Sequence, residues 1–213
     1  MQHVPRQNRV TPFGDIVAVP GRGLLMGNRG VLHDAQQRIV RDSQVRRWIA
    51  CVLEFRGRHR ELMQPNRYTE LFFLDEASAL AAGHRPCAEC RHADYVRFTQ
   101  VWRQAHGNGP WSADAIDAQL HAERRERNDS RVGAWRKRNY TAAIATLPDG
   151  TYIALDDQAW VIQANTLLAW STDRYTTRRP RPHSEAVTVL TPPSLVAVLR
   201  AGYTPMLHPS AKV

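Results

Sequence analysis

Short apolar runs bounded by turn-forming residues dominate the first third of the chain. Residues 15–19, 45–55 and 68–74 are rich in β-branched and aromatic side chains, which favours strands. Residues 61–63 are a candidate partner strand. The stretch GRGLLMGNRG at residues 21–30 has four glycines, which predicts a hairpin. The alternative to a hairpin is that the glycines let the backbone of this stretch approach a bound ligand closely.

A helical period replaces this pattern in the middle of the chain. Asp75 is predicted to cap a helix that ends at Gly83. Residues 91–105 place their large apolar side chains on one helical face. Ser112 is predicted to cap a third helix that runs from residue 113 to about residue 127. The polar, basic segment that follows is expected to be a loop.

The pattern changes again after residue 140. Residues 140–171 alternate apolar runs with turn signals, which predicts an antiparallel meander of three to four strands. Residues 176–184, TTRRPRPHS, are interpreted as a linker or surface loop. A last strand at 185–190 and a last helix at 193–201 are expected to complete an α+β protein.

Three regions follow from these patterns. Residues 1–106 form a small lobe of short antiparallel strands and helices, and residues 107–140 form a helix and a basic linker. Residues 141–213 form a C-terminal β-rich lobe.

Composition narrows the function classes. The 213 residues are 43% hydrophobic, which is enough for a real core, and the formal net charge is +9. Most of the positive charge is arginine, which favours a nucleic-acid partner, although a GC-rich genome produces the same bias. Local clustering of arginine at residues 56–60, 124–138 and 174–181 shifts the balance towards nucleic acid.

Other classes are disfavoured. No run of about 18 apolar residues exists, so a membrane span is not expected. The N-terminus lacks the apolar core of a signal peptide, and three cysteines do not make a disulfide framework. A cytoplasmic location is the expectation.

The most specific chemical signal is a C-x-x-C pair formed by Cys87 and Cys90 at the start of a predicted helix. This arrangement places two thiolates on one metal ion, and the helix N-terminus stabilises their charge. Zinc requires two further ligands. A redox pair is the alternative, but no parallel βαβ pattern surrounds these cysteines. Two buried, unligated thiols remain a further alternative.

The segment FFLDEASALAAGHRPCAEC resembles the second half of the Ada-type metal-binding (methylphosphotriester) domain of bacterial alkylation-repair proteins. The resemblance covers residues 68–90. In that family four cysteines bind zinc, and one cysteine of an upstream pair accepts a methyl group from a DNA phosphotriester. The resemblance implies zinc, with Cys87 and Cys90 as ligands, and a repair-related or regulatory role on DNA.

The upstream half of that pattern is incomplete, because Cys51 is the only cysteine before Cys87. The methyl-accepting role therefore carries over to no residue. We predict Cys51 as the third ligand and His33 as the fourth, with a core thiol as the alternative interpretation of Cys51. The other candidates for the fourth ligand are His59, His84 and His92, or a water molecule at a site of catalytic character.

A second group of chemically interesting side chains lies on the third predicted helix. Asp117, His121 and Arg124 share one helical face, so the carboxylate could orient the imidazole and the arginine could hold a phosphate. The alternative is an ordinary solvated face.

These observations define the functional expectations. The favoured one is a zinc protein that binds nucleic acid, above all DNA. The first alternative is a metal- or histidine-dependent enzyme that acts on nucleic acid or a phosphorylated ligand. The second is a structural zinc protein with a protein partner. The residues expected to contact nucleic acid are Arg58, Arg136, Lys137, Arg138, Arg178 and Arg179.

Overall fold

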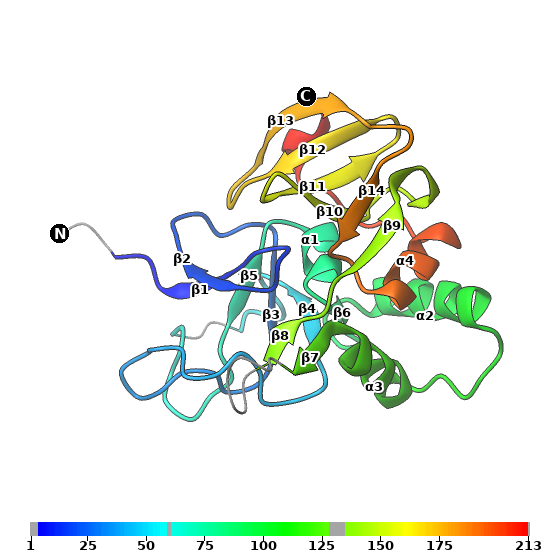
Figure 1. Cartoon of the computed structure of the whole chain (residues 1–213). Coiled ribbons are helices and arrows are strands. Elements are labelled where there is room, and N and C mark those ends of the chain that lie inside the picture. Colours follow the sequence, from blue (N-terminus) through cyan, green and yellow to red (C-terminus); the bar gives the residue numbers. More distant parts are fainter. Residues whose placement is uncertain (1–3, 59–60, 128–134, 213) are drawn as a thin grey trace.

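The computed structural model describes residues 4–58, 61–127 and 135–212. The described part of the chain contains two six-stranded sheets, a two-stranded sheet and four α-helices that pack between and beside the larger sheets (Figure 1). The α+β class is therefore confirmed. None of the described helices is both long and apolar enough to cross a bilayer.

The first sheet contains the N-terminal strands in the order β2-β1-β5-β3-β4-β6. Its pairs are antiparallel except for β1 with β5 and β4 with β6, which run parallel. The strands are β1 (Gln7–Val10), β2 (Ile16–Ala18), β3 (Leu25–Asn28), β4 (Ile49–Val52), β5 (Leu71–Phe73) and β6 (Arg85–Pro86).

The second sheet is entirely antiparallel, in the order β13-β12-β11-β10-β14-β9, and contains the predicted meander. The strands are β9 (Tyr140–Ala143), β10 (Tyr152–Leu155), β11 (Gln158–Gln163), β12 (Thr166–Trp170), β13 (Tyr175–Pro180) and β14 (Ala186–Val189). Strand β13 corrects the prediction of a linker at residues 176–184. It lies at the edge of the sheet, where proline is tolerated because one row of backbone groups needs no partner.

The helices begin and end close to the predicted positions. The Asp75 carboxylate accepts a hydrogen bond from the Ser78 backbone, and Gly83, with a φ of 85°, follows the last turn of the first helix. The α-helices are α1 (Glu76–Ala81), α2 (His92–His106), α3 (Ala113–Arg124) and α4 (Pro193–Arg200), with short 3-10 turns η1 (Ile144–Thr146) and η2 (Pro209–Lys212).

Other local predictions need correction. Residues 61–63 form no strand. The third helix ends at Arg124, and residues 125–127, predicted as its end, form strand β7 (Arg125–Arg127). This strand pairs antiparallel with β8 (Trp135–Lys137), which lies in the basic segment predicted as a loop. Within the glycine-rich stretch, a side chain at Gly23 would collide with the carbonyl oxygen of Phe73. This glycine therefore permits β3 to approach β5, as a turn of the protein itself requires.

The N-terminal sheet has two different faces. Leu25, Ala50 and Phe73 point to one face and pack with Ala79 of helix α1. Because side chains alternate along a strand, the neighbouring residues point to the other face. The register places Met26 directly opposite both Cys51 and Phe72, so Cys51 belongs to the face that α1 does not cover.

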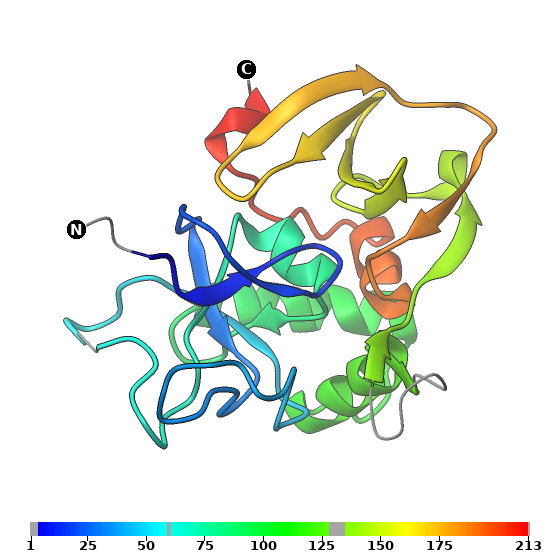
Figure 2. The ribbon, with the colours of Figure 1, turned by 60° about the vertical axis from the view of Figure 1, so that its left-hand side comes forward.

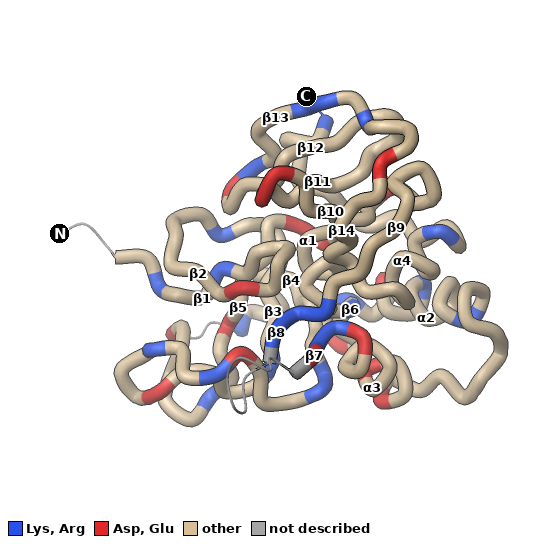
Figure 3. Tube along the Cα trace, in the orientation of Figure 1, with Lys and Arg blue, Asp and Glu red and all other residues tan. Residues whose placement is uncertain are grey.

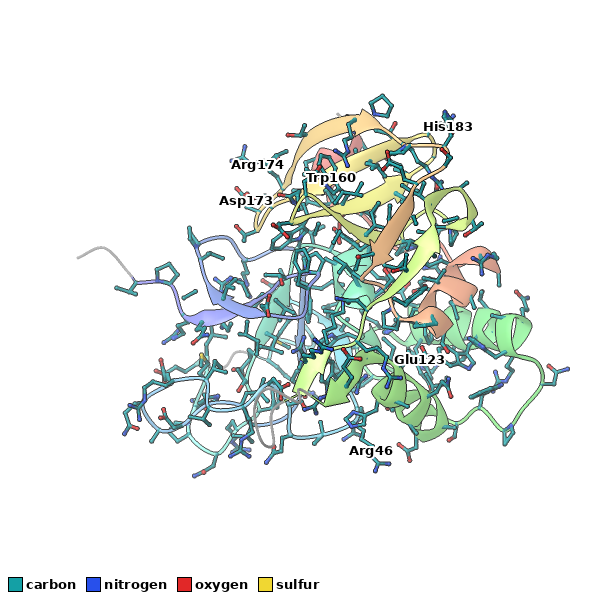
Figure 4. All side chains as sticks on the ribbon, viewed as in Figure 1. Arg46, Glu123, Trp160, Asp173, Arg174 and His183 are labelled. Carbon is teal, nitrogen blue, oxygen red and sulfur yellow. The ribbon has the colours of Figure 1, made fainter. Side chains whose placement is uncertain are left out.

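Helix α1 lies between the two sheets (Figures 1 and 2). Its residues Ala77 and Ala81 pack with Tyr152 and Val161 of the C-terminal sheet. Further along, α4 packs against α2 and α3 in a shared apolar cluster. Glu123 of α3, labelled in Figure 4, accepts hydrogen bonds from the backbone and the hydroxyl of Ser194 in α4. Core residues from the predicted regions 1–106, 107–140 and 141–213 thus pack against each other.

Candidate metal centre

Three cysteines from two separate parts of the chain meet at one point. The Sγ atoms of Cys51, Cys87 and Cys90 all lie within 4.8 Å of one another. Thiolates around a tetrahedral zinc ion, with Zn–S bonds of about 2.3 Å, are themselves about 3.8 Å apart. The cluster therefore has the dimensions of a three-thiolate metal site, and it forms a possible metal centre.

The sheet brings these cysteines together. Strand β6 runs parallel to β4, with Ala50 opposite Pro86. The backbone N–H of Cys87 then donates to the carbonyl oxygen of Ala50 over 2.9 Å. Cys87 consequently lies beside Cys51, and the turn from Cys87 into α2 returns Cys90 to the same place. The parallel pairing of two short strands thus unites the C-x-x-C motif with a cysteine far upstream.

Backbone donors surround the sulfur atoms. The N–H groups of Glu89 and Cys90 donate to Cys87, and the N–H group of Val52 donates to Cys90. Hydrogen bonds from Cys51 and Cys90 also lower the pKa of the Cys87 thiol, while the contact with Cys87 raises the pKa of Cys51. Donors to sulfur favour thiolates, and thiolates are the form that binds metal.

All three cysteines line a pocket of about 340 Å³ on the uncovered face of the N-terminal sheet. Cys51 and Cys87 are only 7% and 6% exposed, so a metal ion here would be largely surrounded by protein. Apolar walls are formed by Met26, Phe55 and Phe72. A ligand atom that enters from the pocket can complete a tetrahedron on three thiolates. The charged lining residues are Arg22, Glu54, Arg58, Glu70 and Glu89.

The structure does not bring His33, the predicted fourth ligand, to the cysteines. Its Nδ1 lies 2.6 Å from the Thr69 hydroxyl and its Nε2 lies 3.1 Å from the Gln64 carbonyl oxygen. Both ring nitrogens are therefore engaged with the loop that precedes β5. Across the described residues, no histidine or carboxylate joins the three cysteines within metal-binding distance of all of them.

The other candidate histidines are also elsewhere. His84 is fully buried, with its ring centroid 4.6 Å from that of Phe73 and 5.2 Å from that of Trp48. His92 is exposed, and its Nδ1 lies 3.1 Å from the Ala88 carbonyl oxygen. His59 falls outside the described residues. None of the histidines that the structure describes therefore supplies a fourth ligand.

The predicted catalytic group on α3 has a different arrangement from the one expected. Both carboxylate oxygens of Asp117 bind Arg85, at 2.9 and 2.7 Å, so neither orients His121. Arg124 is buried and donates to the carbonyl oxygens of Gly83 and Arg46. His121 is half-buried, and its Nδ1 lies 3.4 Å from Arg124. Asp117 thus serves as a buried structural group in this geometry, and Arg124 does not share a site with it.

The residues predicted to bind nucleic acid lie in three separate places. Arg58 lines the cysteine pocket and pairs with Glu89 at 3.0 Å. On β8, Arg136 pairs with Glu126 at 2.7 Å and Lys137 donates to the Pro12 carbonyl oxygen. Directly after β8, Arg138 approaches Glu126 at 3.8 Å. On β13, Arg178 donates to Ala211 and Arg179 lies over the Trp160 ring.

Lysine and arginine residues are distributed along the whole described trace (Figure 3). Arg46 and Arg174, labelled in Figure 4, lie at opposite ends of it. A single basic stripe is therefore not formed, and a role of these six residues in nucleic-acid binding stays a prediction.

Most residues that line the pocket around the cysteines are not identified by the sequence patterns. Arg22 and Tyr68 line it, and Phe72 contributes an aromatic wall. Alternation along 68–74 signals that Phe72 faces away from Phe73, and alternation along 45–55 does the same for Cys51. Nothing local to the sequence indicates that these two faces are the same one.

No family model, curated protein or solved structure matches this chain. The Ada-type resemblance of residues 68–90 accordingly stays a prediction. The geometry of the three cysteines is what indicates a possible metal centre.

Proposed function

We propose that the protein binds one zinc ion through Cys51, Cys87 and Cys90. The observation that carries this proposal is the convergence of three Sγ atoms within 4.8 Å of one another. Thiolate ligands select soft or borderline metals, and zinc is the borderline ion that tetrahedral thiolate sites commonly hold. When bound, zinc would crosslink the strand and the turn and would act as a Lewis acid towards a fourth ligand.

We further propose that the face around this pocket binds nucleic acid, with DNA as the favoured form. Three exposed arginines, Arg22, Arg56 and Arg58, lie near the pocket together with the half-buried aromatic ring of Phe55. Arginine contacts phosphate, and aromatic rings stack with bases, so this combination suits a single strand or a distorted duplex.

Charge supports the same proposal. The chain carries a net charge of +9, which attracts a polyanion at long range. Glu54, Glu70 and Glu89 line the pocket, so phosphate groups would contact the arginines at its rim rather than its floor. The resemblance to the Ada-type domain adds the expectation of a repair-related or regulatory role.

Metal analysis tests the zinc proposal. We expect purified protein to contain one zinc ion per chain, and the Cys51→Ser, Cys87→Ser and Cys90→Ser variants to lose it. His33→Asn is the matched control and is expected to retain the ion, because His33 binds Thr69 and Gln64 instead. Wild-type protein without metal, or a Cys51→Ser variant with undiminished zinc, would contradict the three-cysteine site.

Fluorescence anisotropy with a labelled oligonucleotide tests the second proposal. Affinity is expected to fall steeply with salt, and Arg22→Gln or Arg58→Gln is expected to reduce the salt slope by about 1 each. Arg174→Gln is the control, because Arg174 pairs with Asp173 on the distant β12–β13 turn. Binding that is absent at low salt, or equally reduced in all three variants, would refute a role for this face.

A metal-dependent hydrolase is the second candidate function, favoured by the open pocket side of the three-thiolate cluster. Zinc with three protein ligands and an open position is characteristic of catalytic sites. Glu54 and Glu70 line the same pocket as possible proton acceptors. Metal-dependent hydrolysis of an activated phosphodiester by wild type, lost in Glu54→Gln with full zinc content, would support this alternative. No turnover in zinc-loaded protein would exclude it for that substrate class.

A further inference from the structure

A second cavity, of about 360 Å³, shares no lining residue with the cysteine pocket. It lies where the β1–β2 turn, the end of β3, the C-terminal end of α3 and strand β8 meet (Figures 1 and 3). Five basic residues line it, namely Arg29, Arg124, Arg125, Arg136 and Lys137. Its lining contains two carboxylates, Asp15 and Asp42.

Among the described residues, only two of these five cations form an ion pair with a nearby carboxylate. Arg125 lies 3.4 Å from Asp42, and Arg136 lies 2.7 Å from Glu126. Arg29, Arg124 and Lys137 have no carboxylate within ion-pair distance in the part of the chain that the structure describes. Three positive charges therefore converge on the cavity without a direct counter-ion.

Two of these cations are deeply buried and incompletely hydrogen-bonded. Arg29 is 2% exposed and Arg124 is 1% exposed. Both guanidinium groups stack on the Trp48 ring, at 4.1 and 3.8 Å from its centroid. Nη2 of Arg29 and Nε of Arg124 have no hydrogen-bond partner among the described atoms. Lys137 donates a single bond, to the Pro12 carbonyl oxygen over 2.6 Å.

Burial of charge without a counter-ion is unfavourable. Desolvation lowers the pKa of both Arg29 and Arg124 to about 9, and that of Lys137 well below its ordinary value. A stack on tryptophan offsets part of this penalty. An anion in the cavity would offset more of it, because charge-assisted hydrogen bonds are strong where water is excluded.

We propose that this cavity binds a phosphate monoester group, held by Arg29, Arg124 and Lys137. A dianion matches three converging cations better than a carboxylate does, and guanidinium groups fit tetrahedral oxyanions through paired N–H donors. The guanidinium groups lie inside the fold, so the phosphate must enter the cavity. A small phosphorylated molecule can do this, and so can the terminal phosphate of a nucleic-acid strand, whereas the internal phosphates of a duplex cannot.

Thermal unfolding and calorimetry with inorganic phosphate and a nucleoside 5′-monophosphate test this site. We expect a saturable rise in Tm above that produced by sodium chloride of equal ionic strength. Oligonucleotides with a 5′-phosphate and a 5′-hydroxyl end distinguish the source. A preference for the phosphorylated end that is lost in Lys137→Met supports the site and identifies a strand terminus as its ligand.

Two variants with opposite expected effects on phosphate affinity keep the test decisive if one of them folds poorly. Lys137→Met is expected to weaken phosphate binding about tenfold or more, since a charged donor is lost. Asp42→Asn removes a lining carboxylate and is expected to strengthen binding several-fold. Arg138→Met is the matched control, because Arg138 is exposed directly after β8 and does not line the cavity. This variant should bind inorganic phosphate as wild type does.

Two results would contradict the proposed phosphate site. Phosphate compounds that raise Tm no more than chloride would overturn the proposal. So would wild-type phosphate affinity in both Lys137→Met and Asp42→Asn. Neither result bears on the zinc site, whose residues lie in the other pocket.

Discussion

Arg85 of β6 and Asp117 of α3 form a buried, bidentate ion pair. Nε of Arg85 lies 2.9 Å from one carboxylate oxygen of Asp117, and Nη2 lies 2.7 Å from the other. Both side chains are almost inaccessible to solvent. Because Arg85 is followed at once by Pro86 and Cys87, this pair also connects α3 to the strand that leads into the turn with Cys87 and Cys90.

We expect Asp117→Asn to lower the free energy of unfolding by about 3 kcal/mol or more, since it leaves the Arg85 guanidinium buried without its counter-ion. Urea denaturation measures this change. Asp114→Asn is the control on the same helix, because Asp114 is exposed, and its effect should stay within about 1 kcal/mol. Equal effects of the two substitutions would contradict a structural role for the pair.

The Tyr175 hydroxyl connects the C-terminal sheet to the start of α1. It donates to the buried Asp75 carboxylate at 2.5 Å and lies 2.9 Å from the Tyr152 hydroxyl. Tyr175→Phe deprives a buried carboxylate of a donor, and we expect a loss of about 1–3 kcal/mol in unfolding free energy. Tyr140→Phe is the control because this half-buried residue has no hydroxyl hydrogen bond in the described structure. A Tyr175→Phe variant as stable as that control would show that the bond contributes nothing.

His84 makes stability depend on pH. Burial, together with the positive charges of Arg29 and Arg124, holds the pKa of this imidazole well below its ordinary value of 6.5. The unfolded chain therefore takes up a proton below pH 6.5 that the folded protein does not. The free energy of unfolding is then lost as pH falls, by at most about 1.4 kcal/mol per pH unit.

Comparison of variants isolates this contribution from the other titrating groups. Denaturation at about pH 7 and about pH 5.5 should show a smaller loss of stability in His84→Asn than in wild type. His92→Asn, which changes an exposed imidazole, should retain the wild-type loss. An unchanged difference between the two pH values in His84→Asn would refute the prediction.

Removal of the proposed metal ion should destabilise one region first. Without the ion, nothing holds the three sulfur atoms together and the link from β4 to the turn before α2 is lost. A chelator is therefore expected to lower Tm, and zinc to restore it. Hydrogen exchange should increase around residues 49–52 and 85–91 before it increases in the C-terminal sheet. A uniform increase, or no change in Tm, would contradict a structural contribution of the metal.

Local signals predicted the helices and the meander well, because the information for each of these elements lies within a few residues. The cap at Asp75, the helix start at Ser112 and the meander after residue 140 all appear at or near the predicted positions. Strand β13 was missed, because two prolines and several arginines suggest a linker, while an edge position tolerates both. The β7–β8 hairpin was missed because its strands are polar and short.

The sequence by itself determined the α+β class, the C-x-x-C pair as part of a possible metal site and the strongly basic character of the chain. Only the tertiary structure decided which groups meet. Parallel pairing of β4 with β6 places Cys51 beside Cys87 and Cys90, and the loop after β3 directs His33 to Thr69 instead. The same holds for Asp117, whose partner Arg85 is distant in sequence. Spacing along one element predicts which side chains share a face, whereas contacts between elements depend on strand order and packing, which no local pattern contains.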